Sequence, residues 1–242
     1  MSQQYLDNLE SGLYEPIIPE PEASVPEPEA HEREERGYTS KRIMDITVSG
    51  LGLIGTLPVT LATAAVIAIE GIFNKIARGP LFFNQERTGK NGKRFRIHKF
   101  RSMVKDADKM YNDIFGDNTH AMLSKNRKDP RITLVGNFIR KYGIDELPQL
   151  WNVLKGDMSI VGPRPYADNL NDKVAANSKE RYICLPGITG PFQLKRHLYD
   201  NPDDIMSLDG EYTDFYRNSY NIWKDIGYVM KTACFVLSGK HR

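Results

Sequence analysis

The sequence predicts a mainly helical α+β protein of the monotopic membrane type, in which a re-entrant helix-break-helix hairpin joins a small cytosolic domain containing a short β-hairpin. Residues 46–69 form an uncharged apolar run with a proline near its middle. Residues 75–105 carry basic and apolar side chains between turn signals, as short strands do. The expected units are a disordered acidic tail over 1–38, the hairpin over 39–75 and the cytosolic domain over 76–242.

The charge of the first 37 residues is opposite to that of the rest. They hold ten acidic residues and two arginines, although the whole chain has a formal net charge of +2. Repeated Pro and Glu with few large apolar side chains cannot bury enough surface to offset the entropy lost on folding, so we expect a disordered tail. The basic remainder predicts an anionic partner, which could be nucleic acid, lipid head groups or a phosphorylated substrate.

The two cysteines, Cys184 and Cys234, lie far apart and form no CxxC pair. This pattern predicts neither a disulfide framework nor a zinc site, and reduced thiols are the default.

The apolar run contains a competing pattern. Gly50, Gly52 and Gly55 have the spacing of a dinucleotide-binding turn, and Glu70 follows at about the distance of a ribose-binding acid. Pro58, however, falls in the first turns of the helix that this fold would need. The run also lacks the polar positions that a surface helix shows at every turn. The pattern therefore favours a membrane segment over a cofactor site.

The flanks of the run indicate how it meets the membrane. Pro58 removes a backbone hydrogen bond and favours a kink at the middle. Lys41 and Arg42 precede the run, and Lys75 and Arg78 follow it. Because basic residues prefer the cytoplasmic face, both ends are expected inside, as in a re-entrant hairpin. A simple transmembrane span and a buried core helix of a soluble domain remain the alternatives.

The basic segment after the run predicts a β-hairpin. "KRFRIHKFRSM" alternates basic and apolar residues, and "TGKNGKRF" before it has the composition of a hairpin loop. A solvated face beside a membrane explains most of its cations. A solvated face explains "KFRS", residues 99–102, less well. Phe100 and Ser102 alternate with Lys99 and Arg101, which suggests that these two cations pack at a specific position. No DNA- or RNA-reading motif is present, so nucleic acid is not an expected partner.

An acidic pair precedes a predicted helix. Asp145 and Glu146 stand before the apolar positions of "LPQLWNVL", which have helical spacing, and Gly156 marks the expected end. Pro148 then lies in the first turn, where proline is tolerated. An ordinary N-cap, stabilised by the helix dipole, is one interpretation of the pair.

Three nearby arginines favour a second interpretation, a site for a metal and a phosphate. Arg131 and Arg140 lie upstream of the acidic pair, and Arg164 lies in the stiff "GPRP" turn downstream. Mg²⁺ takes carboxylate and phosphate oxygens together, and arginine binds phosphate oxygens with two N–H groups. An ionised carboxylate in such a site can act as a nucleophile. The pattern predicts phosphoryl transfer through an acyl phosphate.

These motifs resemble, in order and over about Lys41–Lys240, the bacterial polyprenyl-phosphate sugar-1-phosphate transferases, the monotopic phosphoglycosyl transferases. The match rests on "KRIMD", "GPLFFNQERTG", "FRIHKFRSM", "DPRIT", "IDELPQLWNVLKGDMSIVGPRP" and "LPGITGPFQLKR". It is similar above all to the short members of exopolysaccharide production. The resemblance implies an enzyme on the cytoplasmic face of the inner membrane, held there by the hairpin.

The resemblance also implies roles for individual residues. Asp145 attacks the β-phosphate of a UDP-sugar, UMP leaves, and undecaprenyl phosphate then takes the sugar phosphate from Asp145; Glu146 helps to hold Mg²⁺. The residues expected at the phosphates or the uridine are Arg140, Arg164, Pro165, Lys99, Arg101 and Arg131. Membrane lipid and other polysaccharide-assembly proteins are further expected partners. Phe192 stands where many members have Trp, which leaves the sugar contacts open.

UDP-galactose or UDP-glucose is the expected donor, since the resemblance is to exopolysaccharide starters. Two rival functions remain open, a membrane-bound phosphohydrolase in which water resolves the Asp145 intermediate and a non-catalytic scaffold of polysaccharide assembly. At the C-terminal end, Ile222, Trp223, Ile226 and Met230 form one amphipathic stripe, which would lie either at the membrane interface or against the core.

Overall fold

A computed structural model describes residues 28–107, 109–110, 129–165, 179–195 and 202–238. The chain divides into two compact units, Met1–Arg33 and Glu34–Arg242. Most of the first unit, and with it most of the predicted acidic tail, lies outside the described residues. Within the described ranges, the second unit holds every strand and every helix except the start of the first one.

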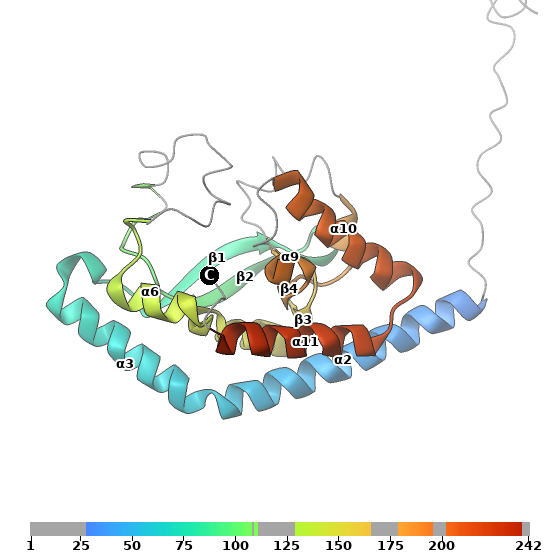
Figure 1. The fold of residues 1–242 in the computed structure, drawn as a ribbon, viewed down its shortest axis with the longest axis horizontal. Helices are drawn as coiled ribbons and strands as arrows, with labels where there is room; N and C mark the ends of the chain where they lie inside the picture. The colour runs from blue at the N-terminus through green and yellow to red at the C-terminus, as the bar shows by residue number, and fades with distance from the viewer. Residues whose placement is uncertain (1–27, 108, 111–128, 166–178, 196–201, 239–242) are drawn as a thin grey trace, which may run out of the picture. The chain divides into compact units, whose positions relative to one another are not determined.

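Two helices that meet at a sharp bend occupy the predicted hairpin (Figure 1). α2 spans Pro28–Gly55 and α3 spans Leu57–Phe73, and the helix axes bend by 58° at the break. Pro58 is the second residue of α3 and lacks the N–H that would continue the hydrogen bonding of α2. Thr56 stands at the break, where its hydroxyl donates to the Gly52 carbonyl at 2.7 Å. Because α2 begins at Pro28, the predicted boundary after residue 38 falls inside a helix.

Among the described residues, no single helix has both the length and the apolar composition to cross a bilayer, although the bent pair Tyr38–Gly55 and Leu57–Phe73 together has both. Its surface is apolar, with Leu51, Ile54 and Leu61 each more than 60% exposed. A helix pair with this bend and composition fits a re-entrant loop or a broken span.

The basic residues before the run are bound within the protein. Lys41 is only 4% exposed and is bound inside the folded body, and Arg42 donates to the carbonyls of Val153 and Leu154. Lys75 and Arg78, which follow the run, are exposed as expected. Packing therefore explains the first basic pair, and that pair carries no independent information about topology.

The predicted β-hairpin is confirmed. β1 (Phe82–Thr88) pairs antiparallel with β2 (Arg94–Phe100) in a register that sets Phe82 opposite Phe100. The short 3₁₀ turn η2 (Lys90–Gly92) connects them, and Asn91 and Gly92 adopt positive φ angles of 56° and 75°, which Asn and Gly tolerate. Phe95 and Ile97 of β2 are buried while Arg94 and Arg96 beside them are exposed, as the alternation predicts.

A second, parallel pair of strands was not predicted. β3 (Ser159–Val161) pairs with β4 (Gly187–Thr189). The backbones approach so closely that a Cβ on Gly187 would lie 2.1 Å from the Gly162 nitrogen, so glycine is required there. Strands of three residues are too short to give a period-two signal, which explains why sequence patterns missed them.

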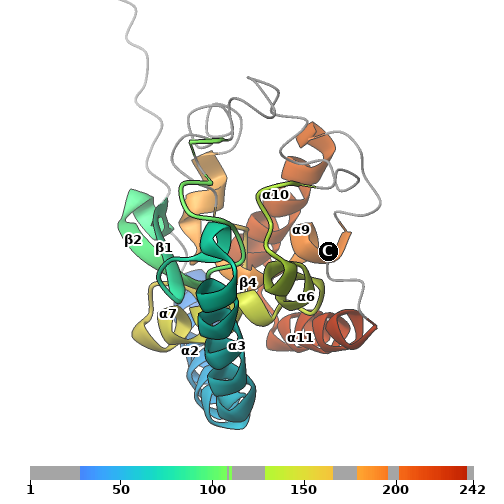
Figure 2. The same cartoon turned by 90° about the vertical axis from the view of Figure 1, so that its left-hand side faces the viewer.

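The β1–β2 hairpin lies at one edge of the view in Figure 2, with the other described elements beside it. They are the helices α6 (Leu134–Lys141), α7 (Gln149–Lys155), α9 (Pro191–Lys195), α10 (Pro202–Asn218) and α11 (Ile222–Leu237), with the 3₁₀ turns η1 (Lys75–Ala77), η3 (Ile144–Glu146) and η4 (Lys179–Ile183). The larger core cluster joins β2, α7, β3 and α10 through residues such as Ile97, Val153 and Tyr212. A smaller cluster of Ile67, Phe100 and Ile139 joins α3, β2 and α6.

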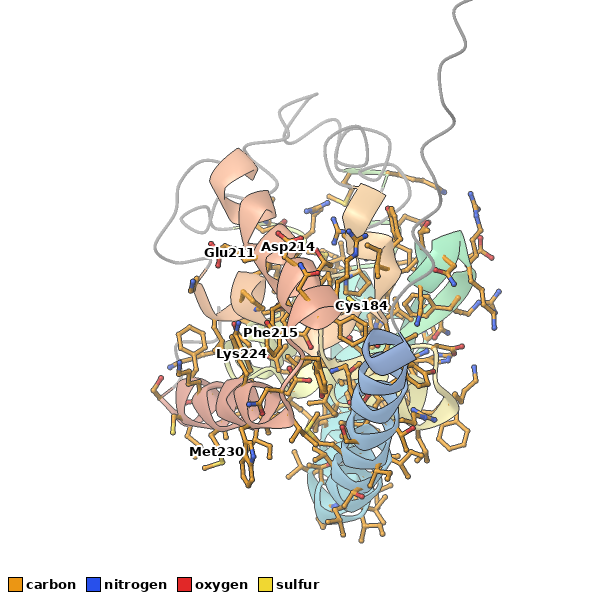
Figure 3. All side chains as sticks on the ribbon, turned by 90° about the vertical axis from the view of Figure 1, so that its right-hand side faces the viewer. Cys184, Glu211, Asp214, Phe215, Lys224 and Met230 are labelled. Atoms are coloured by element: carbon orange, nitrogen blue, oxygen red, sulfur yellow. The ribbon has the colours of Figure 1, made fainter. Side chains whose placement is uncertain are left out.

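The predicted stripe on α11 is partly outside the core. Trp223 and Met230 are 73% and 61% exposed, whereas Ile226 is half-buried. In Figure 3, Met230 projects from the side of α11 opposite to Lys224 and Phe215, where α11 meets α10. One side of α11 therefore packs on the body while the other presents apolar side chains outward.

The cysteines form no disulfide. Cys184 is buried, and this burial raises the pKa of its thiol to about 12, while Cys234 is exposed. Both cysteines are therefore free thiols, as predicted.

Candidate active site

The acidic pair lies in a 3₁₀ turn between two helices. Gly143 follows α6 with a left-handed φ of 64°, and η3 comes directly after it. Asp145 and Glu146 are 8% and 9% exposed. Pro148, not the acidic pair, is the N-cap residue of α7, and Gly156 ends that helix as predicted. The N-cap interpretation of the pair is therefore wrong, since neither carboxylate occupies the capping position.

Two of the predicted cations converge on Glu146. Lys99 Nζ lies 2.7 Å from Glu146 Oε1, and Arg164 Nη2 lies 3.8 Å from the same oxygen. Lys99 comes from β2 and Arg164 from the Pro-Arg-Pro turn, so three separate motifs meet at one carboxylate. Lysine and arginine side chains in such a position can bind phosphate oxygens.

Asn152 positions α7 against β2, and sequence patterns did not single it out. It is fully buried; its Oδ1 accepts from the His98 N–H at 3.1 Å, and its Nδ2 donates to the Arg96 carbonyl at 2.8 Å. The side-chain amide thus pairs with the edge of β2 as another strand would. This fixes Lys99, the next residue of β2, relative to Glu146.

The Pro-Arg-Pro turn is held by two arginines that we did not predict to serve the site. Arg87 Nη1 donates to the Pro165 carbonyl at 3.2 Å, and Arg181 Nη2 donates to the Arg164 carbonyl. Arg181 is itself paired with the buried Asp209 of α10 at 3.1 Å. Arg87 lies in the "NQERTG" motif, so the sequence offered a signal that could have identified it as a site residue. Arg181 and Asp209 lie in no such motif.

Phe192 contributes to the same turn. The Arg164 guanidinium carbon lies 5.7 Å from the centroid of the Phe192 ring, within cation–π range. The residue that departs from the family pattern therefore contacts a predicted phosphate-binding arginine.

The other predicted basic residues have contacts of their own. Arg131 Nε and Nη2 donate to the Asp129 carboxylate at 2.9 and 2.8 Å. Although burial alone would raise the pKa of Asp129, Arg131 and Arg140 hold it below its ordinary value. Arg131 is therefore engaged by a local carboxylate, and Arg140 lies near the same group.

Arg101 packs at the end of the hairpin. A Cβ on Gly79 would lie 2.6 Å from Arg101 Nη1, and burial lowers the pKa of Arg101 while Glu70 opposes this change. Glu70 Oε1 also accepts from the Val135 N–H of α6 at 3.1 Å. The acid that suggested a ribose-binding role thus stands beside Arg101 and α6.

The acidic pair suits a hard divalent cation that takes some of its ligands from the protein and the others from the substrate. Among the described residues, no group of three or more His, Cys, Asp and Glu side chains could enclose a metal. Mg²⁺, however, is commonly held by one or two carboxylates together with substrate phosphates. Asp145 and Glu146 supply this oxygen donor set, so they are the residues that would hold it.

Three residues of the "KRIMD" motif fix α2 to the site body. Lys41 Nζ bonds Asp225 Oδ2 at 2.6 Å and the Val161 carbonyl at 2.9 Å. The Asp45 carboxylate accepts from the Ile160 N–H at 2.8 Å and from the Ser159 hydroxyl. Arg42 donates hydrogen bonds to the carbonyls of Val153 and Leu154 in α7. Together, the contacts of Lys41, Arg42 and Asp45 hold the base of the hairpin against β3 and α7.

Asp209 is expected to make stability depend on pH near 6. Burial raises its pKa to about 6, against the opposing effect of Arg181. Since this pKa lies above the ordinary 3.8, the stabilising contribution of the proton is complete below about pH 4 and is lost as the pH rises through about 6. The stability of the parent relative to Asp209→Asn should therefore fall by about 1 kcal/mol from about pH 5 to about pH 7.5.

Thermal unfolding of both proteins across this range measures the effect. Asp214→Asn, an exposed position on the same helix (Figure 3), is the matched control and should show no such trend relative to the parent. A parent–Asp209→Asn difference that stays constant with pH would contradict the elevated pKa.

The comparisons with known proteins agree with this assembly of motifs. The family model for bacterial sugar transferases matches residues 36–239. The chain is 41% identical over 202 residues to the galactosyl transferase CpsE of Streptococcus agalactiae, covering 83% of this chain and 42% of that protein. It is 37% identical over 203 residues to the UDP-N-acetylgalactosamine-undecaprenyl-phosphate N-acetylgalactosaminephosphotransferase of Aeromonas hydrophila, covering 82% and 44%.

A third relative is the undecaprenyl-phosphate galactose phosphotransferase of Salmonella typhimurium, with 35% identity over 202 residues, 81% of this chain and 40% of that protein. The chain thus spans about two fifths of the length of these relatives. The matched region contains the hairpin, the acidic pair and the Pro-Arg-Pro turn. With a family model that covers most of its length and with these motifs meeting at Glu146, the chain belongs to the bacterial sugar transferase family.

Proposed function

We propose that this protein transfers a sugar-1-phosphate from a UDP-sugar to undecaprenyl phosphate, at the cytoplasmic face of the inner membrane, to begin exopolysaccharide synthesis. The observation that carries the proposal is the buried pair Asp145 and Glu146, with Lys99 and Arg164 at 2.7 and 3.8 Å from Glu146. The names of the relatives support the reaction class. The bent apolar hairpin supports the location, since a hairpin inserted in a membrane would hold the site close to a lipid acceptor.

In the first step, an Asp145 carboxylate oxygen attacks the β-phosphorus of the UDP-sugar. The new bond joins Asp145 to phosphorus, the bond from that phosphorus to the bridging oxygen breaks, and UMP leaves with that oxygen and its electron pair. Arg164 and Lys99, which lie 3.8 and 2.7 Å from Glu146, would offset the negative charge of the diphosphate. Mg²⁺, when bound by Asp145 and Glu146, supplies further positive charge to the phosphate oxygens.

In the second step, a phosphate oxygen of undecaprenyl phosphate attacks the same phosphorus. The bond to Asp145 breaks, its carboxylate is restored, and the product is a lipid diphosphate sugar. Burial of the acidic pair favours this route, since water that reached the intermediate would hydrolyse it instead. A hydrolase would release sugar phosphate steadily without lipid. For a non-catalytic scaffold, replacing Asp145 would leave polysaccharide production unchanged.

The donor is proposed to be UDP-galactose or UDP-glucose. The relatives carry galactose and N-acetylgalactosamine in their names, so the donor panel should include UDP-N-acetylgalactosamine.

Intact-protein mass spectrometry tests the proposal. The purified full chain is incubated with Mg²⁺ and one UDP-sugar at a time, without lipid. A sugar-phosphate adduct is expected on the parent, absent from Asp145→Asn and from EDTA-treated parent, and cleared by undecaprenyl phosphate. UMP release that requires lipid, with no adduct for any donor, would replace the two steps by direct attack of the lipid. Neither adduct nor UMP with any donor would overturn the proposed reaction.

A further inference from the structure

Gln149, the first residue of α7, has a buried side-chain amide whose donor is unused. The side chain is 2% exposed, and its Nε2 atom has no hydrogen-bond partner among the described residues. A buried N–H group without a partner destabilises a fold, because it loses its hydrogen bonds to water and gains none in return. Packing alone therefore does not explain a glutamine at this position.

Gln149 lies one helical turn after the acidic pair. The N–H groups of Glu146, Leu147 and Leu150 each donate to the carbonyl three residues earlier, so the backbone winds in one sense from η3 into α7. Residues three or four positions apart on such a path lie on the same side of it. Gln149 therefore shares a side of this path with Asp145 and Glu146.

The neighbours of Gln149 on this side both reach β2. Glu146, three residues earlier, pairs with Lys99 of that strand. Asn152, three residues later, uses both ends of its amide on the β2 backbone. Of the two buried amides in this row, the one farther from the acidic pair is satisfied within the fold. The donor of the nearer one is left for something else.

We propose that Gln149 is a further catalytic residue of the site, whose Nε2 donates a hydrogen bond to an oxygen of the phosphate that is transferred. The inference rests on the proposed function and adds to it a residue with no assigned role. Lys99 and Arg164 both lie near Glu146, whereas the amide donor is unengaged among the described residues. A donor held in a buried site is already oriented when negative charge develops on the phosphate oxygens, so it stabilises the transition state.

The proposal predicts a variant that is more stable than the parent but less active. Gln149→Met keeps the length of the side chain and removes the unused donor, so the melting temperature should rise by about 2–4 °C. Asn152→Leu is the comparison, since it replaces the satisfied amide of the same row. Its melting temperature should fall, because the substitution leaves backbone groups of β2 without partners.

Steady-state and single-turnover assays of the full chain measure the activity. For Gln149→Met, kcat for lipid-linked product should fall about 100-fold or more, while KM for the UDP-sugar changes by less than about threefold. Formation of the sugar-phosphate adduct and its clearance by undecaprenyl phosphate should both slow, because both steps pass through the same phosphorus. Lys155→Met makes the same replacement at a 47% exposed side chain of α7 and should match the parent throughout.

Three results for Gln149→Met would overturn the inference. A lower melting temperature would show that the amide stabilises the fold, for example through a bound water. A parent-like kcat in the folded variant would show that the donor takes no part in the reaction. A raised KM for the UDP-sugar with an unchanged kcat would place the amide at a part of the donor away from the transferred phosphate.

These results stay distinct from failure of the proposed function. If the parent forms no lipid-linked product with any UDP-sugar, the reaction itself is wrong, and the inference falls with it. If the parent forms product without an adduct, the lipid attacks the phosphate directly. The fall in kcat of Gln149→Met then still tests the contact between the amide and that phosphate.

Discussion

Asp145→Asn should abolish sugar-1-phosphate transfer while leaving the fold intact. Asn has nearly the shape of Asp, but its amide oxygen is a far weaker nucleophile and carries no charge. Asp145 is 8% exposed in a short turn in which the Glu146 N–H donates to the Gly143 carbonyl. Removal of a catalytic nucleophile commonly costs about 10⁴-fold or more in rate, and we expect a loss of that size. Formation of lipid-linked product and UMP release both measure it.

Asp157→Asn is the matched control for this substitution. Asp157 follows α7 and forms a surface ion pair with Lys155 at 2.9 Å, so its loss should change the rate by less than about twofold. Thermal unfolding of both variants checks that neither has lost its structure. If Asp145→Asn keeps activity within about tenfold of the parent while Glu146→Gln loses it, Asp145 is not the nucleophile and direct attack by the lipid becomes the better scheme.

Lys41→Met should cost on the order of 3 kcal/mol of stability, because it leaves a buried carboxylate without its cation. Lys41 and Asp225 are 4% and 0% exposed, and their charged atoms lie 2.6 Å apart. The hydroxyls of Tyr212 and Tyr220 still donate to the Asp225 carboxylate at 2.9 and 3.1 Å, which limits the loss. For a body of this size the melting temperature should fall by about 6–12 °C.

Two comparisons establish the cause of this loss. Lys195→Met removes an exposed pair with Glu211, whose side chains are 43% and 63% exposed, and should cost less than about 1 kcal/mol. The double variant Lys41→Met with Asp225→Asn removes the uncompensated charge and should be more stable than the sum of the single losses predicts. Strict additivity in this cycle would show that the two groups do not stabilise each other.

The features that the sequence predicted correctly are those set by a residue and its immediate neighbours. Pro58 breaks the apolar helix because it has no N–H, so the bend needs no distant partner. Asn91 and Gly92 tolerate the positive φ angles of the β-hairpin turn. Gly156 ends α7 in the left-handed conformation for the same local reason. The acidic pair and its Pro-Arg-Pro partner stood out because few residue types suit phosphate chemistry.

The features that the tertiary structure decided depend on partners far along the chain. Lys41 lies in an otherwise ordinary basic flank, yet it is buried against groups 120 and 184 residues away. The sequence also grouped Arg131 with the site, whereas Asp129 engages it. Asn152, Arg181 and Asp209 hold the site in place without any motif to mark them.

The sequence by itself therefore determined which local features the protein has: a bent apolar hairpin, a carboxylate pair and a set of cations. The tertiary structure brought Lys99 and Arg164 to Glu146. The physical reason is that local conformation follows from backbone sterics within a few residues, whereas the burial of a charge depends on the partners that folding brings to it.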